Sequence, residues 1–233
     1  MILAAGRGER MRPLSDACPK PLLAVGGKAL IVWQIERLAE AGIRELVINH
    51  AHLGAQIEAA LGDGRRHGVR IIYSPEAEAL ETAGGVANAL PLLGTEPFLV
   101  VSADIYCECD YRALTAAQAA DGALAHLWLV DNRPWHPHGD FALSGGFLRS
   151  AGEPRLTYSN IGIYRPEFFA GVASGSKMPL RPLLDRAIAA GKVRGARLDA
   201  LWDNIGTPAQ LAELDAALER RRTQADCHPD SHQ

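Results

Sequence analysis

The fold is decided by the run Ile2-Leu3-Ala4-Ala5-Gly6-Arg7-Gly8-Glu9-Arg10, in which a short apolar stretch leads directly into a loop of glycine and arginine. We expect its first three residues to form a core strand. Gly6 and Gly8 can adopt positive φ and let backbone N–H groups approach an anion closely. Arg10 and Lys20 can add charge-assisted hydrogen bonds. The run therefore predicts a loop that binds the phosphates of a nucleoside triphosphate, although an isolated Gly-x-Gly also fits a plain turn.

Composition is that of an ordinary globular protein. Of the 233 residues, 48% are hydrophobic and 22% are charged, and the formal net charge is −3. This balance gives no electrostatic reason to bind nucleic acid or a membrane. We expect a single domain over residues 1–222 and a polar, disordered tail over 223–233, as a monomer or small homo-oligomer.

The four cysteines indicate neither a disulfide framework nor a zinc site. Cys18 and Cys227 are isolated, and the pair Cys107 and Cys109 lacks the second pair or the histidines that zinc needs. No apolar run is long enough to cross a bilayer, and the apolar start is too short for a signal peptide. We therefore expect reduced thiols and a cytoplasmic protein.

The order of apolar and helical stretches predicts an α/β fold with a Rossmann-like, mostly parallel sheet flanked by helices. Strands are expected over 2–4, 45–49, 69–73 and 98–101, and helices over 29–41, 53–61 and 84–90. One interpretation of Thr82 is that it caps the last of these helices. In the second half, strand candidates over 124–130, 141–148 and 156–164 are broken by Pro, Gly, His and Asp. We expect a small mixed β extension that lies over the sheet as one wall of a cleft, and helices over 180–190 and 208–221.

A carboxylate ends the strongest predicted strand. Asp104 follows Val100-Val101-Ser102-Ala103, and ligands of open α/β sheets bind at the carboxyl ends of strands. Asp104 is therefore a candidate to hold a divalent cation that bridges phosphates. The structural alternative is a turn aspartate that only terminates the strand.

Together these motifs resemble the signature of the sugar-1-phosphate nucleotidyltransferases, which join a nucleoside monophosphate to a sugar 1-phosphate and release pyrophosphate. The resemblance rests on Leu-Ala-Ala-Gly-x-Gly-x-Arg-Met-x-Pro-Leu at 3–14, followed by Pro-Lys-Pro at 19–21, and it extends to about residue 220. It implies a glycosyltransferase-A-like sheet, Mg²⁺ as cofactor, and catalytic roles for Arg10, Lys20 and Asp104. The nucleotide-binding residues that it implies are Leu3, Ala4, Ala5, Gly6, Gly8, Arg10, Lys20, Glu81, Thr82 and Gly85.

The resemblance also implies a second metal ligand. The segment Trp202-Asp203-Asn204-Ile205-Gly206-Thr207 is similar to the family's W-x-D-x-G-T, with Asn204 at the position of the usual metal-binding aspartate. An amide oxygen can coordinate Mg²⁺, although it brings no charge. Asp203 points the other way in an extended strand and would substitute only through a local bulge. The predicted metal ligands are Asp104 and Asn204.

Base and sugar recognition are also implied by the resemblance. Leu80 to Gly85 looks like the family's base-recognition turn, with Glu81 where glycine is more common. Sugar-binding residues are implied at Gly139, Asp140, Asn160 and Lys177. The scattered histidines His50, His52, His136 and His138 lack a metal spacing, and we expect them on the surface or in loops.

The chain contains Val47-Ile48-Asn49-His50-Ala51, Tyr73-Ser74-Pro75-Glu76 and Gly139-Asp140-Phe141. With these phrases it most resembles, within the family, the uridylyltransferases that use UTP and N-acetylmuramate 1-phosphate in peptidoglycan recycling. The lactyl carboxylate of that sugar would need a cation or several N–H donors, and Arg133, Arg155 and Lys177 are the candidate cations. Two alternatives stay open. One is another specificity, such as mannose-1-phosphate guanylyltransferase or glucose-1-phosphate uridylyltransferase. The other is a catalytically silent nucleotide-binding regulatory protein, which Asn204 suggests.

Overall fold

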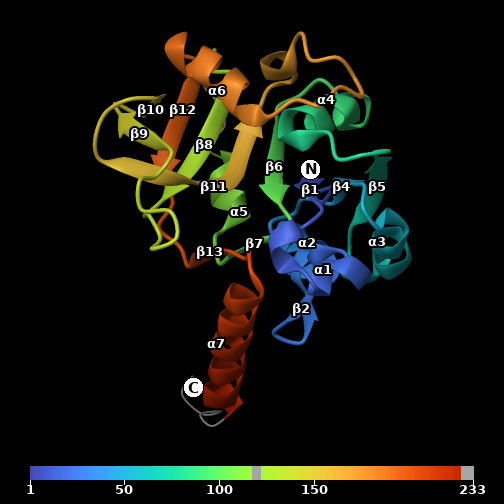
Figure 1. The fold of residues 1–233 in the computed structure, drawn as a ribbon. Coiled ribbons are helices and arrows are strands. Elements are labelled where there is room, and N and C mark those ends of the chain that lie inside the picture. The colour runs from blue at the N-terminus through green and yellow to red at the C-terminus, as the bar shows by residue number, and fades with distance from the viewer. Residues whose placement is uncertain (117–121, 227–233) are drawn as a thin grey trace.

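A nine-stranded sheet runs through the molecule (Figure 1). The structure is a computed structural model that describes residues 1–116 and 122–226. The strand order across the sheet is β5-β4-β1-β6-β11-β8-β12-β10-β9. These strands are β1 (Ile2–Leu3), β4 (Glu45–His50), β5 (Arg70–Pro75), β6 (Phe98–Ser102), β8 (Ala125–Val130), β9 (Phe141–Ser144), β10 (Phe147–Arg149), β11 (Arg155–Tyr164) and β12 (Val193–Arg197).

The first half of the chain forms the predicted parallel part of the sheet. Strands β5, β4, β1 and β6 are parallel neighbours, and Ile2 lies opposite both Ile48 and Val101. The helices between them are α2 (Leu30–Glu40), α3 (Gly54–Leu61) and α4 (Glu81–Leu93). The strand and helix predictions for this half are therefore confirmed in type and order. The interpretation of Thr82 as the cap of α4 is wrong, because the helix starts earlier, with Leu80 at the N-cap and no side-chain cap.

The second half continues the same sheet. Strand β11 pairs antiparallel with both β6 and β8, so the mixed extension lengthens the sheet and does not lie over it as expected. Backbone groups along the edge of β6 are satisfied by β11 in this arrangement. The predicted strand 141–148 is a hairpin of β9 and β10, because Gly145 and Gly146 both adopt positive φ, at 59° and 77°. Helices α5 (Tyr111–Ala116) and α6 (Leu180–Ala189) belong to this half, and α7 (Pro208–Asp226) follows them.

Side chains of the sheet alternate between two hydrophobic cores. On β6, Val100 belongs to the cluster that includes residues of α4 and α6, whereas Val101 belongs to the cluster that includes residues of α2, α3 and α5. Val47 and Ile48 on β4 divide in the same way. Continuous apolar strands of this kind are typical of a sheet buried on both faces.

Helix α7 (Pro208–Asp226) runs outward from the body of the protein (Figure 1). Thr207 caps it, since its Oγ1 accepts a hydrogen bond of 3.3 Å from the N–H of Gln210. Leu211 and Leu214 fix the start of the helix to a third cluster with Met11. The helix continues through residues 223–226 of the expected tail, and residues 227–233 lie outside the described residues. No helix within the described ranges, α7 included, combines the length and apolar character that a membrane span needs.

Candidate nucleotide and sugar-phosphate site

Two cavities adjoin at the carboxyl end of the parallel strands. The larger has a volume of about 680 Å³ and the smaller about 360 Å³, and Leu3, Thr82 and Ser102 line both. Most of the predicted nucleotide-binding and catalytic residues line the larger cavity, namely Leu3, Ala4, Ala5, Gly6, Gly8, Arg10, Lys20, Glu81, Thr82 and Asp104. The residues of the sequence motif therefore line the larger of these two cavities.

The glycine loop is shaped by Gly8. This residue has φ of 68°, and its carbonyl oxygen accepts hydrogen bonds from the N–H of Met11 and the hydroxyl of Ser15, both at 2.8 Å. A Cβ at this position would lie 3.1 Å from the Cβ of Lys20. Glycine thus provides both the left-handed backbone and the close approach of Lys20 to the loop.

Lys20 and Asp104 form an ion pair in the larger cavity. The Nζ of Lys20 lies 2.5 Å from Oδ2 of Asp104, and only 8% of Lys20 is exposed. The sequence motifs suggest different roles for these two residues, phosphate binding for the lysine and metal binding for the aspartate. Their contact brings both roles to one point in the cavity, where a phosphate and a cation could interact.

A two-stranded ladder brings the second proposed metal ligand beside Asp104. Strand β13 (Trp202–Asn204) pairs antiparallel with β7 (Ile105–Cys107), with Asn204 opposite Ile105, and the N–H of Ile205 donates to the Asp104 carbonyl at 2.8 Å. The register of the ladder is regular, without the bulge that would turn Asp203 toward the site. Asp203 lines neither cavity, and burial raises the pKa of its carboxyl.

The Asn204 side chain has the character expected of a cation ligand. Its Oδ1 is buried and has no hydrogen-bond partner within the described residues, a state that is costly unless something else binds the oxygen. No group of three or more His, Cys, Asp and Glu side chains suited to a metal occurs in the described parts of the chain. Mg²⁺ is commonly held by one or two protein ligands plus phosphate oxygens and water, so Asp104 and Asn204 fit that ion.

A buried hydrogen-bonded chain connects the glycine loop with the start of α4. Asn49 accepts from the N–H of Ala4 at 3.0 Å and donates to Glu76 at 2.7 Å. The other oxygen of Glu76 accepts from the N–H of Leu80 at 2.9 Å. Gly85 packs against this chain, since a Cβ there would lie 2.7 Å from both side chains. Gly85 lines neither cavity, so its observed role is to make room for this pair.

Glu81 carries backbone strain at the edge of the larger cavity. It has φ of 62°, although it is the first residue of α4 and has a side chain. A non-glycine residue in this region costs about 1–2 kcal/mol. Such strain often occurs at sites of function, and Glu81 lines the cavity that holds the glycine loop.

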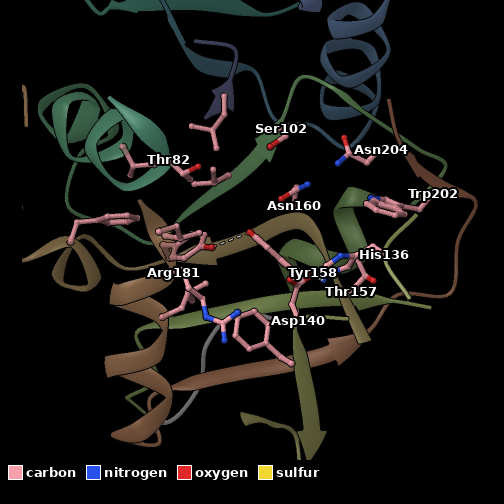
Figure 2. Close-up of a pocket in the computed structure, with 18 of the residues that line it drawn as sticks. Thr82, Ser102, His136, Asp140, Thr157, Tyr158, Asn160, Arg181, Trp202 and Asn204 are labelled. Atoms are coloured by element: carbon pink, nitrogen blue, oxygen red, sulfur yellow. Dashed lines mark hydrogen bonds and ion pairs between the residues drawn. The ribbon is translucent and has the colours of Figure 1, made fainter. Parts of the chain in front are cut away.

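The smaller cavity contains only part of the predicted sugar-binding set (Figure 2). Asp140 and Asn160 line it, whereas Gly139 and Lys177 do not. The Oδ2 of Asp140 accepts from the N–H of Tyr158 at 2.8 Å, which fixes the carboxylate. Gly139 adopts φ of 58°, and a Cβ there would clash with the Asn132 amide at 2.7 Å. Glycine at position 139 is therefore explained by a tight turn in the backbone.

Several residues of the site have no counterpart among the sequence predictions. Asn49 is the next-to-last residue of β4 and Ser102 is the last residue of β6, so the rule that ligands bind at strand ends could have found them. Aromatic and charged residues from other elements carry no such signal; they are Trp135, His136, Tyr158 and Arg181. Figure 2 shows the hydroxyl of Tyr158 bonded to that of Tyr164, at 2.9 Å, and burial raises the pKa of both phenols.

The histidine expectation holds for three residues of four. His52, His136 and His138 lie in turns and loops. His50 is buried at the end of β4, where its Nε2 lies 2.7 Å from Glu58, so the expectation of a surface or loop position is wrong there. Gly54 provides the space for this ring, because a Cβ at Gly54 would lie 2.0 Å from Nδ1.

Comparison with known proteins identifies relatives along almost the whole chain. The "Nucleotidyl transferase" family model matches residues 1–142. An N-acetylmuramate alpha-1-phosphate uridylyltransferase of Neisseria meningitidis serogroup B is 53% identical over 93% of this chain and 96% of its own length. A Caulobacter vibrioides protein of the same name is 37% identical over 94% of this chain and 96% of its own. HddC of Yersinia pseudotuberculosis with GMP-PN shares the fold, with a TM-score of 0.76 and 18% identity over 93% and 97% of the two chains.

The strain at Glu81 predicts a reversal of the usual glycine and alanine preference in a helix. At ordinary helical positions glycine is less stable than alanine by about 1 kcal/mol. We expect Glu81→Gly to be at least as stable as Glu81→Ala, because only glycine relieves the positive φ. Urea denaturation of both variants measures the difference. The control is Leu92, an exposed residue of the same helix. There we expect Leu92→Ala to be more stable than Leu92→Gly. A less stable Glu81→Gly would contradict the strain.

Proposed function

The chain belongs to the nucleotidyl transferase family, and we propose that it transfers UMP from UTP to N-acetylmuramate 1-phosphate, with release of pyrophosphate. The observation that carries this proposal is the 53% identity, over 93% of the chain, to a relative with that named activity. The alternative substrates, mannose 1-phosphate with GTP and glucose 1-phosphate with UTP, have no comparable support. A silent regulatory role is disfavoured because Arg10, Lys20 and Asp104 all line one cavity.

The two adjoining cavities support a reaction between two phosphorylated substrates. In this proposal the triphosphate occupies the larger cavity, along the glycine loop, and the sugar 1-phosphate occupies the smaller one. The shared wall of Leu3, Thr82 and Ser102 is where the two cavities meet. Substrates bound there would have their phosphates close together, which removes much of the entropic barrier to a two-substrate reaction.

The proposed chemistry needs positioning and positive charge more than a nucleophilic side chain. A phosphate oxygen of the sugar 1-phosphate attacks the α-phosphorus of UTP, and the bond to the β-phosphate oxygen breaks, so pyrophosphate leaves with its electron pair. The attacking phosphate is already ionised at neutral pH. Lys20 would exchange its contact with Asp104 for an α-phosphate oxygen, and Arg10 would bind the leaving phosphates.

Members of this family generally use a divalent metal ion, and we infer that here it is Mg²⁺ bound by Asp104 and Asn204. The ion would supply neutralisation of phosphate charge. Asp104 would provide the one charged protein ligand and Asn204 the buried amide oxygen that lacks a partner. The inferred ligand pair fits the preference of Mg²⁺ for oxygen ligands.

The proposed reaction assigns the protein to peptidoglycan recycling, because N-acetylmuramate is a peptidoglycan sugar. UTP is a cytoplasmic nucleotide, and we infer that the protein acts in the cytoplasm. Cys18, Cys107 and Cys109 are present as free thiols, which agrees with a reducing compartment.

Substrate preference tests the proposal directly. We expect kcat/KM with UTP to be highest for N-acetylmuramate 1-phosphate, by about 10- to 150-fold over N-acetylglucosamine 1-phosphate, the range expected for one charge-paired carboxylate. The measurement is pyrophosphate release for these two sugars and for glucose and mannose 1-phosphates, with UTP and GTP in turn. Faster turnover of mannose 1-phosphate with GTP would overturn the proposed substrates and leave the reaction class standing.

Removal of the Lys20 ammonium tests the proposed role in charge stabilisation. Lys20→Ala should lower kcat by at least about 100-fold, the scale for loss of one preorganised donor. The matched control is Lys28→Ala, because Lys28 pairs with Glu36 and lines neither cavity. Near-normal kcat in a folded Lys20→Ala protein, with the control also unaffected, would eliminate the role.

The metal proposal predicts opposite effects at its two ligands. Asp104→Asn should lower Mg²⁺-dependent kcat/KM by at least about 100-fold, and Asn204→Asp should tighten Mn²⁺ binding because it adds a charge. Steady-state rates over a Mg²⁺ titration and paramagnetic resonance of bound Mn²⁺ measure the two effects. Asp203→Asn is the control, since Asp203 lines neither cavity. Full activity of Asp104→Asn at low Mg²⁺ would refute the assignment.

A further inference from the structure

Arg181 is the one lysine or arginine among the described residues that line the smaller cavity. It lies on the first turn of α6. Figure 2 shows Arg181 at the lower left of the cavity and Asn204 at the upper right, with Asn160 between them. The cavity therefore has a proposed phosphate end, near Asn204, and a positively charged distal end.

The Arg181 guanidinium is held in place by two neighbours. Its Nε donates to both carboxylate oxygens of Asp185, at 2.9 and 3.0 Å, and its centre lies 4.9 Å from the ring centroid of Phe141. These contacts involve Nε and one face of the planar guanidinium. The two Nη groups make no hydrogen bond to Asp185 and form the free edge of the guanidinium. About half of the side chain is exposed, which makes the free edge reachable from the cavity. A planar, fixed fork of this kind suits bidentate binding of a carboxylate.

The direction of the bound sugar follows from its phosphate. The 1-phosphate must reach the shared wall and Asp104 for the proposed reaction, so the opposite part of the ring extends toward the distal end. In N-acetylmuramate the 3-oxygen carries a lactyl group that ends in a carboxylate. We propose that Arg181 binds this carboxylate and determines specificity for the acidic sugar, an inference that rests on the proposed function.

The cations considered from sequence alone do not serve this purpose. Arg133, Arg155 and Lys177 do not line the smaller cavity. Arg133 donates to the Trp202 carbonyl, and Arg155 donates to the carbonyls of Asp140 and Ser150. Both arginines therefore hold backbone segments in place. Arg181 gave no sequence signal because a charge at the start of a helix is most often a solvated surface charge.

Two substrates that differ only at the 3-oxygen test the proposal. N-acetylglucosamine 1-phosphate has a hydroxyl where N-acetylmuramate 1-phosphate has the lactyl ether. We expect Arg181→Ala to lower kcat/KM for the acidic sugar by at least about 10-fold, mainly through KM, and to change the value for the neutral sugar less than about twofold. Arg181→Lys should retain part of the preference. Arg186→Ala is the control, because Arg186 is exposed on the same helix and lines neither cavity.

The ratio of the two kcat/KM values separates the possible outcomes. Both substrates are measured on one preparation, so partial unfolding of a variant cancels in the ratio. An unchanged ratio in Arg181→Ala, with wild-type preference for the acidic sugar, would overturn this inference alone. If the ratio is unchanged because both sugars lose kcat/KM equally, Arg181 acts on the phosphate or ring that the two sugars share. A wild-type enzyme without preference for the acidic sugar would overturn the proposed function, and this inference with it.

Discussion

The ladder between β7 and β13 is the contact on which the arrangement of the site depends. It joins the segment directly after Asp104 to a segment almost one hundred residues later, and so brings Asn204 beside that aspartate. Each strand is also held by one hydrogen bond from a side chain. The Gln34 side chain donates to the carbonyl of Ile105 at 2.7 Å, and the Trp202 indole donates to the carbonyl of Ser159 at 2.8 Å. The second bond also ties the ladder to β11, next to Asn160, so one short pairing positions groups of both cavities.

The fold could be predicted where the local pattern decides the structure. Buried runs such as residues 98–101 are strands in any context that covers both faces, and the parallel half of the sheet was therefore predictable. Strand β12, with the sequence Val-Arg-Gly-Ala-Arg, has no such pattern. It becomes a strand because β8 offers an edge, and because Gly195 leaves room for the Leu148 side chain, 2.1 Å from where a Cβ would be. Tertiary pairing of this kind overrides local preference.

The site was predictable where its residues lie on one continuous motif. The glycine loop and Lys20 are a local signature, and they line one cavity as expected. Gly85 shows the limit, because a glycine required for a ligand and a glycine required by neighbouring side chains are identical in sequence. Lys177 and Arg181 show a second limit: sequence gives the charge of a side chain but not the surface that it faces. Arg181 lies on α6 against Phe141 and lines the smaller cavity, whereas Lys177 precedes that helix and does not.

The hydrogen-bonded chain through Asn49 and Glu76 has a consequence for how this protein can diverge. The Asn49 side chain accepts a hydrogen bond from the backbone N–H of Ala4, and the Glu76 side chain accepts one from the backbone N–H of Leu80. The two side chains are also hydrogen-bonded to each other. Replacement of one leaves a buried partner unsatisfied, whereas coordinated replacement of both does not carry that full cost. Gly85 joins the same unit through space. Descendants of this sequence should therefore show covariation among positions 49, 76 and 85, and evolutionary drift at any one of them alone should be rare.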